Sequence, residues 1–186
     1  MEAHEAAAIE RAKAGDRDAF RDLVERYSRG VFRLGYRMTG NSTDAEDVVQ
    51  ETLFRAWKQI RSFDGRAAFS SWLHRIAANY AVDLVRARRR FDKSEGAEDR
   101  VALTTATGPA QDQLVYAGQL SDRIEHAMGQ LTPQERAAFV LRHFEGQPIE
   151  EICAALGLRT NAAKQSIFRA VQKLRRALKP IVEAAR

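Results

Sequence analysis

The sequence has little of what several classes of protein require. Its 186 residues include one cysteine, Cys153, so no disulfide can form within the chain and no cysteine-based metal cluster is possible. The four histidines are scattered along the chain. No apolar run approaches the roughly 20 residues that a membrane span needs, and the acidic start MEAHEAAAIE does not resemble a signal peptide. We therefore expect a cytoplasmic protein that uses no metal and no cofactor.

Strand patterns are also nearly absent. β-Branched residues do not alternate, and apolar residues recur at helical spacing instead. The stretch 91–113 differs from the rest, because it holds five acids, two glycines and a proline without a sustained period. We predict an all-α protein of two small helical domains, residues 1–90 and 114–186, joined by a flexible linker over 91–113.

The segment PIEEICAALGLRTNAAKQSIFRAVQKLRRAL (148–178) has the pattern of a helix-turn-helix. The small Cys153 allows two helices to approach closely, and Gly157 suits the positive φ of the turn. From Arg159 to Lys179 there are seven bases and no acid. Turn geometry combined with charge of one sign is typical of DNA binding. The alternative is an ordinary helical hairpin with a solvated basic face.

Recognition helices contact base edges from their N-terminal half. Lys164, Gln165 and Arg169 lie on the first two turns of the predicted second helix. Glutamine pairs well with adenine, and lysine or arginine pairs with guanine or phosphate. Phe168 is adjacent, and we expect its ring either on a thymine methyl or in the core.

Two capping boxes predict further helix starts. Thr132 with Glu135 begins a helix that supports the helix-turn-helix, and Thr43 with Glu46 begins a helix that extends to Ile60.

The segment DAEDVVQETLFRAWKQI (44–60) begins with four acids and no base, in a chain of net charge +5. On a helix, the face with Val49, Leu53, Ala56 and Ile60 is expected in the core. The opposite face carries polar residues and one aromatic: Asp47, Gln50, Glu51, Phe54 and Lys58. The helix dipole explains acids in the first turn, but it does not explain the aromatic. The alternative is that this face docks on a basic protein.

The segment FSSWLHRIAANYAVDLVRARRR (69–90) interleaves aromatics with bases and ends in RARRR. Rings can stack on unpaired bases while cations follow the DNA backbone. Phe69 and Trp72 therefore either contact single-stranded DNA or pack in the core, whereas for Tyr80 we favour the core. The preceding loop, 61–69, is rich in small residues and could surround one extruded base.

Taken together, these segments resemble the bacterial sigma factors of the extracytoplasmic-function (ECF) group. DAEDVVQETLFRAW resembles the group's region 2.2, and FSSWLHRIAANYAVDLVRARRR resembles regions 2.3 and 2.4. The stretch from Leu131 to Leu178 resembles region 4. One departure is NAAKQSIFRA, which has Gln165 and Ser166 where serine and arginine are usual in the family.

The resemblance implies a transcription initiation factor, not an enzyme. Its expected partners are core RNA polymerase, promoter DNA and an anti-sigma factor. The polymerase contacts would be Asp47, Gln50, Glu51 and Phe54. The minus-ten contacts would be Phe69, Trp72, Arg75, Ile76, Asn79, Arg86 and Arg88. The minus-thirty-five contacts would be Arg159, Thr160, Lys164, Gln165, Phe168 and Arg169.

Two other functions remain as alternatives. A repressor or activator that binds DNA alone would need neither the acidic segment 44–51 nor the aromatic and basic helix 69–90. A scaffold that only sequesters a partner would not need a basic recognition helix.

Overall fold

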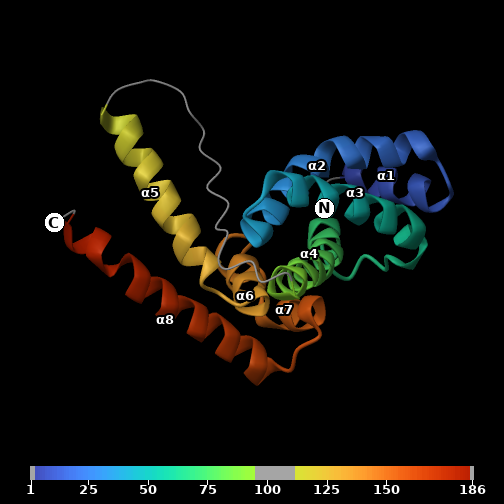
Figure 1. Ribbon diagram of the computed structural model, residues 1–186. Helices are drawn as coiled ribbons and strands as arrows, with labels where there is room; N and C mark the ends of the chain where they lie inside the picture. Colours follow the sequence, from blue (N-terminus) through green and yellow to red (C-terminus); the bar gives the residue numbers. More distant parts are fainter. Residues whose placement is uncertain (1–2, 95–111, 185–186) are drawn as a thin grey trace.

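The computed structural model describes residues 3–94 and 112–184, with side chains described for 4–91 and 120–180 (Figure 1). All regular secondary structure in this part of the chain is helical, which confirms the all-α prediction. The N-terminal domain consists of α1 (Ala3–Lys13), α2 (Arg17–Thr39), α3 (Ser42–Gln59), the short 3₁₀ helix η1 (Ile60–Ser62) and α4 (Phe69–Ser94). The C-terminal domain consists of α5 (Asp112–Gly129), α6 (Pro133–His143), α7 (Ile149–Leu156) and α8 (Thr160–Ala184).

The ends of the linker predicted over 91–113 overlap with two described helices. Helix α4 continues to Ser94, and α5 already begins at Asp112. The remainder of the predicted flexible linker, residues 95–111, lies outside the described residues.

Several helix ends follow the local sequence rules. Gly40 ends α2 with φ 73°, and Gly157 ends α7 with φ 62°, a left-handed conformation that glycine adopts without a steric penalty. Thr132 accepts a hydrogen bond from the backbone of Glu135, whose side chain accepts one in return. The capping box predicted at Thr132 is therefore confirmed.

The predicted start of α3 is wrong by two residues. The cap is Asn41, whose side-chain oxygen accepts a hydrogen bond from the Asp44 backbone at 2.9 Å, and Thr43 lies inside the first turn with its side chain exposed. Both residues are good caps by type, but Gly40 ends α2 so closely upstream that only Asn41 has the extended backbone a cap needs.

The core face of α3 is also rotated from the predicted one. Ala56 and Ile60 are buried as expected, but Val49 and Leu53 are only partly buried. Their places are taken by the neighbouring side chains Ala45, Val48 and Thr52. The small Gly35 of α2 explains this rotation, because a Cβ there would lie 3.2 Å from the side chain of Val48.

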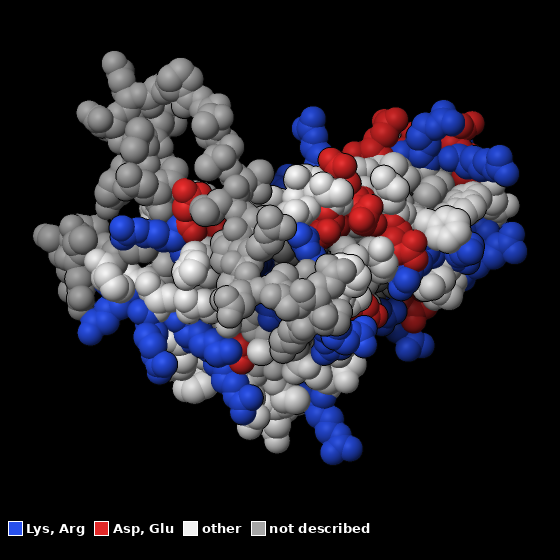
Figure 2. Space-filling view, in the orientation of Figure 1, with Lys and Arg blue, Asp and Glu red and all other residues white. Residues whose placement is uncertain are grey.

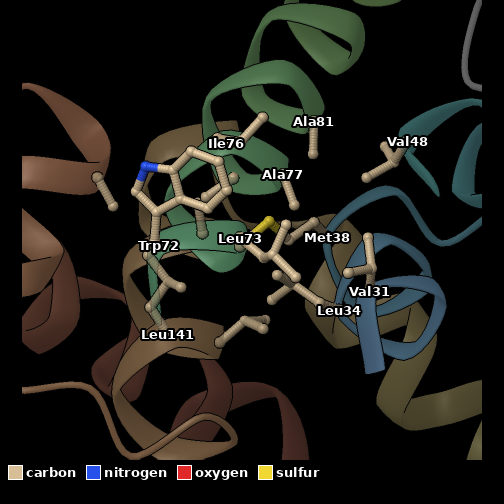
Figure 3. Close-up of a cluster of buried hydrophobic side chains, with 14 of the residues drawn as sticks. Val31, Leu34, Met38, Val48, Trp72, Leu73, Ile76, Ala77, Ala81 and Leu141 are labelled. Atoms are coloured by element: carbon tan, nitrogen blue, oxygen red, sulfur yellow. The ribbon is translucent and has the colours of Figure 1, made fainter. Parts of the chain in front are cut away.

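Helix α4 lies at the centre of the molecule (Figure 1). It packs against α2 and α3 of its own domain and against α6 and α7 of the C-terminal domain. The buried apolar side chains form one cluster that includes residues of both domains. Figure 3 shows Leu141 of α6 in the same buried cluster as Trp72 and Leu73 of α4 and Leu34 and Met38 of α2.

The corrected cap of α3 gives a stability prediction. Asn41→Ala should lower the free energy of unfolding by about 1 kcal/mol, because the Asp44 backbone loses its hydrogen-bond partner. Thr43→Ala is the matched control and should change stability by less than about 0.5 kcal/mol, since its exposed side chain does not cap the helix. Urea unfolding followed by circular dichroism measures both. An equal loss in the two variants would contradict the assignment of the cap.

Candidate protein and nucleic-acid interfaces

The acidic face of α3 is open to solvent. Asp47 and Gln50 are exposed, and Glu51 forms an ion pair with Arg55 at 2.6 Å. Phe54 keeps 53% of its surface exposed, with the Lys58 ammonium 4.1 Å from its ring centroid. An exposed aromatic ring amid carboxylates is not required by the fold, and it suits a partner surface that is both basic and apolar.

The same face continues onto α2, which the sequence patterns did not indicate. A shallow groove of about 450 Å³ lies between the two helices, and its lining is Ser28, Arg29, Phe32, Arg33, Glu46, Val49 and Gln50. The rings of Phe32 and Tyr36 stack with centroids 6.5 Å apart, and Tyr36 is partly exposed. Two aromatics four residues apart on α2 were the signal that could have revealed this second half of the surface.

The predicted minus-ten residues on α4 differ in solvent exposure. Phe69, Trp72 and Ile76 are buried, with exposed fractions of 1%, 7% and 8%. The exposed members of the predicted set are Arg75, Asn79, Arg86 and Arg88. Arg88 forms an ion pair with Asp44 of α3 at 2.6 Å, although its side chain remains half exposed.

Phe69 has the environment of a core residue. Its ring centroid lies 5.4 Å from that of Tyr27, 5.3 Å from that of Phe63 and 5.3 Å from that of Trp72. Phe63 belongs to the 61–69 loop and is itself buried. Such offset and edge-on ring packing stabilises the loop against α4, so of the two alternatives for Phe69 the structure favours packing in the core.

Helix α8 presents the basic residues of the helix-turn-helix to solvent. Arg159, Lys164, Gln165 and Arg169 are exposed, as is Thr160. Phe168 is 63% exposed, so its ring is not part of the core. Figure 2 shows Lys and Arg side chains gathered along the side of the molecule formed by α8, while acidic side chains are concentrated on the part formed by α1 to α3.

The recognition helix is fixed to α6 by two polar contacts. Ser166 is buried, and its hydroxyl accepts a hydrogen bond from the Gln134 amide at 3.1 Å. Lys173 forms an ion pair with Glu135 at 2.6 Å. Burial raises the pKa of Glu135, but the hydrogen bonds from Lys173 and Thr132 outweigh it and hold the pKa below the usual value. Ser166 is thus a packing residue, while its neighbour Gln165 faces solvent.

Two further features of the described residues concern other kinds of function. Among the described residues, no three His, Cys, Asp or Glu side chains come together as a potential metal site. None of the described helices combines the length and the apolar character needed to cross a membrane.

Comparison with family models identifies both domains. Residues 23–91 match sigma-70 region 2, which includes most of α2, all of α3 and nearly all of α4. Residues 121–174 match sigma-70 region 4, which includes the helix-turn-helix.

Curated relatives align with most of the chain. The ECF RNA polymerase sigma factor SigW of Bacillus subtilis is 32% identical over 93% of this chain and 96% of its own length. The ECF RNA polymerase sigma-E factor of Escherichia coli is 32% identical, with 94% of each protein aligned. The ECF sigma factor SigE of Mycolicibacterium smegmatis is 36% identical over 83% of this chain, which spans 59% of that relative's length.

Solved structures of two further proteins are similar to this chain over most of its length. CnrH, in complex with the cytosolic domain of CnrY, has a TM-score of 0.64 at 26% identity and covers 95% of this chain and 98% of its own. The sigma factor RpoE of Bartonella quintana, in complex with the anti-sigma factor NepR, has a TM-score of 0.66 at 25% identity, with 86% of this chain and 96% of its own covered. The two domains, their order along the chain and the sequence identities all agree with those of ECF sigma factors. The chain belongs to the ECF RNA polymerase sigma factor family.

Proposed function

We propose that this protein binds core RNA polymerase and directs it to promoters, where it contacts the minus-ten and minus-thirty-five elements and helps to open the duplex. The observation that carries the proposal is the combination of two exposed surfaces of opposite charge on one chain. One is the acidic and aromatic face of α3, and the other is the basic recognition helix α8.

The polymerase contact is assigned to the α3 face. The side chains of Asp47, Gln50, Glu51 and Phe54 are exposed or half exposed, and these residues lie within the match to sigma-70 region 2. The groove beside α2 extends this surface, and its Phe32 supplies apolar area next to the charged groups. The carboxylates of α3 attract a basic partner over a distance, and the aromatic residues exclude water at the contact, while Arg29 and Arg33 on the α2 side of the groove suit acidic groups of that partner.

The minus-ten contact is assigned to α4. Arg75, Asn79, Arg86 and Arg88 are exposed, and arginines along one helix can follow a DNA backbone. Trp72 and Ile76 lie in the same sigma-70 region 2 match but are buried, and the ring of Trp72 packs against those of Phe63 and Phe69. Phe69 supports the loop from the core, so we propose for it a packing role in place of a base contact.

The minus-thirty-five contact is assigned to the start of α8. Gln165 is exposed on the second turn and suits a bidentate contact with adenine. Lys164 and Arg169 flank it, and they can contact guanine or phosphate, as can Arg159 at the helix start. Thr160 can donate to phosphate, and the exposed ring of Phe168 can contact a thymine methyl.

An anti-sigma factor is a proposed third partner. CnrH was solved with the cytosolic domain of CnrY, and the Bartonella quintana sigma factor was solved with the anti-sigma factor NepR. The similarity of this chain to both extends over most of its length, which supports a comparable partner here.

The decisive experiment is reconstitution. The purified protein is mixed with core RNA polymerase, and transcripts from a library of genomic fragments are mapped. Initiation at a discrete set of start sites, dependent on the added protein, supports the proposal. Binding to DNA without any effect of polymerase would instead favour a repressor, and binding to polymerase without initiation would favour a scaffold.

The acidic face gives a docking prediction. Glu51→Lys should weaken binding to core polymerase by about 1–3 kcal/mol, because a carboxylate contact is lost and a like charge is introduced. Glu150→Lys is the control, since it makes the same change of net charge at an exposed site on α7. Titration of labelled protein with core polymerase measures both affinities, and circular dichroism checks helix content. Equal affinity in the two variants would refute the assignment.

Two adjacent residues of α8 give a specificity prediction. Gln165→Ala should relax base preference in the minus-thirty-five element while leaving stability almost unchanged, because the side chain is exposed. Ser166→Ala should leave base preference unchanged but cost about 1 kcal/mol of stability, because the Gln134 amide loses its buried partner. Selection from randomised duplexes measures the first effect, and thermal unfolding measures the second. Relaxed preference in Ser166→Ala alone would reverse the two roles.

A further inference from the structure

Helix α1 lies outside the residues that match sigma-70 region 2, because that match begins at residue 23. It packs along α2 and contacts η1, where the 61–69 loop begins (Figure 1). Its apolar residues Ala8, Ile9 and Ala12 are buried in the main cluster. Helix α1 therefore packs against the start of the loop as well as against α2.

Glu5 of α1 makes a buried polar contact with α2. Its carboxylate accepts a hydrogen bond from the Tyr27 hydroxyl at 2.6 Å, although Glu5 is only 8% exposed. A short hydrogen bond to a carboxylate fixes the direction of the phenol ring. That ring meets the Phe69 ring edge-on, with centroids 5.4 Å apart. Glu5 is thus connected through one side chain to the first residue of α4.

Lys13 makes a second contact from the other end of α1. Its ammonium nitrogen lies 5.7 Å from the ring centroid of Phe63, within the range of a cation–π interaction. Glu10 pairs with the same ammonium at 2.8 Å and so orients it. The Phe63 ring packs in turn against that of Phe69, with centroids 5.3 Å apart. The two contacts of α1 therefore meet in one aromatic cluster, the first through Tyr27 and the second through Phe63.

The 61–69 loop has few anchors of its own. Among residues 61–68 the only buried one is Phe63, and both Asp64 and Arg66 are exposed. The Asp64 carboxylate accepts a hydrogen bond from the Arg66 backbone at 3.0 Å, which orders the turn locally. That bond does not connect the turn to the rest of the domain. The position of the loop therefore depends on how the Phe63 ring is held.

We propose that α1 positions the minus-ten loop. The hydrogen bond of Glu5 with Tyr27 and the contact of Lys13 with Phe63 hold the aromatic cluster in place, so that the 61–69 loop can receive one extruded nucleobase. The inference rests on the proposed function, because the opened minus-ten element supplies that nucleobase. Both α1 residues are positioning residues that act through aromatic rings. A loop that is ordered before DNA arrives loses less conformational freedom on binding, so fixing it should tighten the contact.

Two backbone hydrogen bonds report on the loop. The Phe63 amide donates to the Ile60 carbonyl, and the Trp72 amide donates to the Ala68 carbonyl, both at 3.1 Å. They lie at the two ends of the loop, so faster hydrogen exchange of these amides measures its local opening. NMR on the full-length free protein follows both amides, and the amides of α8 serve as the reference for global stability.

The variants separate the hydrogen bond from the packing around it. Tyr27→Phe keeps the ring but removes the hydroxyl that donates to Glu5, and it should speed exchange of both reporter amides severalfold. Glu5→Ala should do the same, whereas Glu5→Gln should stay near the parent rate, because its amide oxygen can still accept. The double variant of Glu5→Ala and Tyr27→Phe should be no faster than the faster single variant, since both changes remove one hydrogen bond.

The control is His4→Ala, because His4 is exposed and adjacent to Glu5 on α1. It should leave the reporter amides unchanged. A loss of protection in Glu5→Ala that extends to α8 would transfer the decision to Tyr27→Phe and to Lys13→Gln, which removes only the cation near Phe63. Exchange in these two variants no faster than in the control overturns the proposal.

A second measurement separates the positioning role from the proposed function. A promoter fragment recovered in the reconstitution experiment is bound by core polymerase with the added protein, and each nucleotide of one minus-ten strand is replaced in turn by an abasic site. In the parent, one position should lose affinity severalfold. In Tyr27→Phe the loss at that position should be much smaller, while losses at other positions should persist.

The two possible failures differ in what they show. If the parent has no abasic-sensitive position on either strand, the loop does not receive a nucleobase, and this part of the proposed function fails together with the inference. If the parent has one and Tyr27→Phe is equally sensitive there, the proposed function stands and the positioning role of α1 is refuted.

Discussion

The packing of α4 is the interaction on which the rest of the structure depends. Its apolar side chains, such as Leu73 and Ala77, belong to the buried cluster, and its His74 contacts Glu145 and Gln147 of the C-terminal domain. One helix therefore stabilises the region 2 fold and also provides the surface against which region 4 rests. Because α4 packs against both domains, Phe69, Trp72 and Ile76 in its first half are buried, while Arg75 and Asn79 of the same half are exposed.

Charge is distributed so that the two domains suit different partners. Acids are concentrated on α3, and the seven bases between Arg159 and Lys179 follow one another on α8 without an intervening acid. The net charge of +5 does not show this separation, because it gives only the sum over the chain. A basic protein and a polyanion can therefore be bound by the same chain without competition for one surface.

Rules that depend on neighbouring residues predicted helices and several helix ends, but they did not decide whether the aromatic side chain of Phe69 is buried. Thr132 and Gly157 were identified from residue type and spacing, since caps and turns depend on neighbours in the sequence. Phe69 could not be assigned from sequence, because an aromatic beside bases suits a core and a DNA surface equally well. The contact of Arg37 with Glu145 joins residues 108 positions apart, so no local pattern could reveal it. The groove between α2 and α3 was also missed, although the spacing of Phe32 and Tyr36 on α2 was a local signal for it.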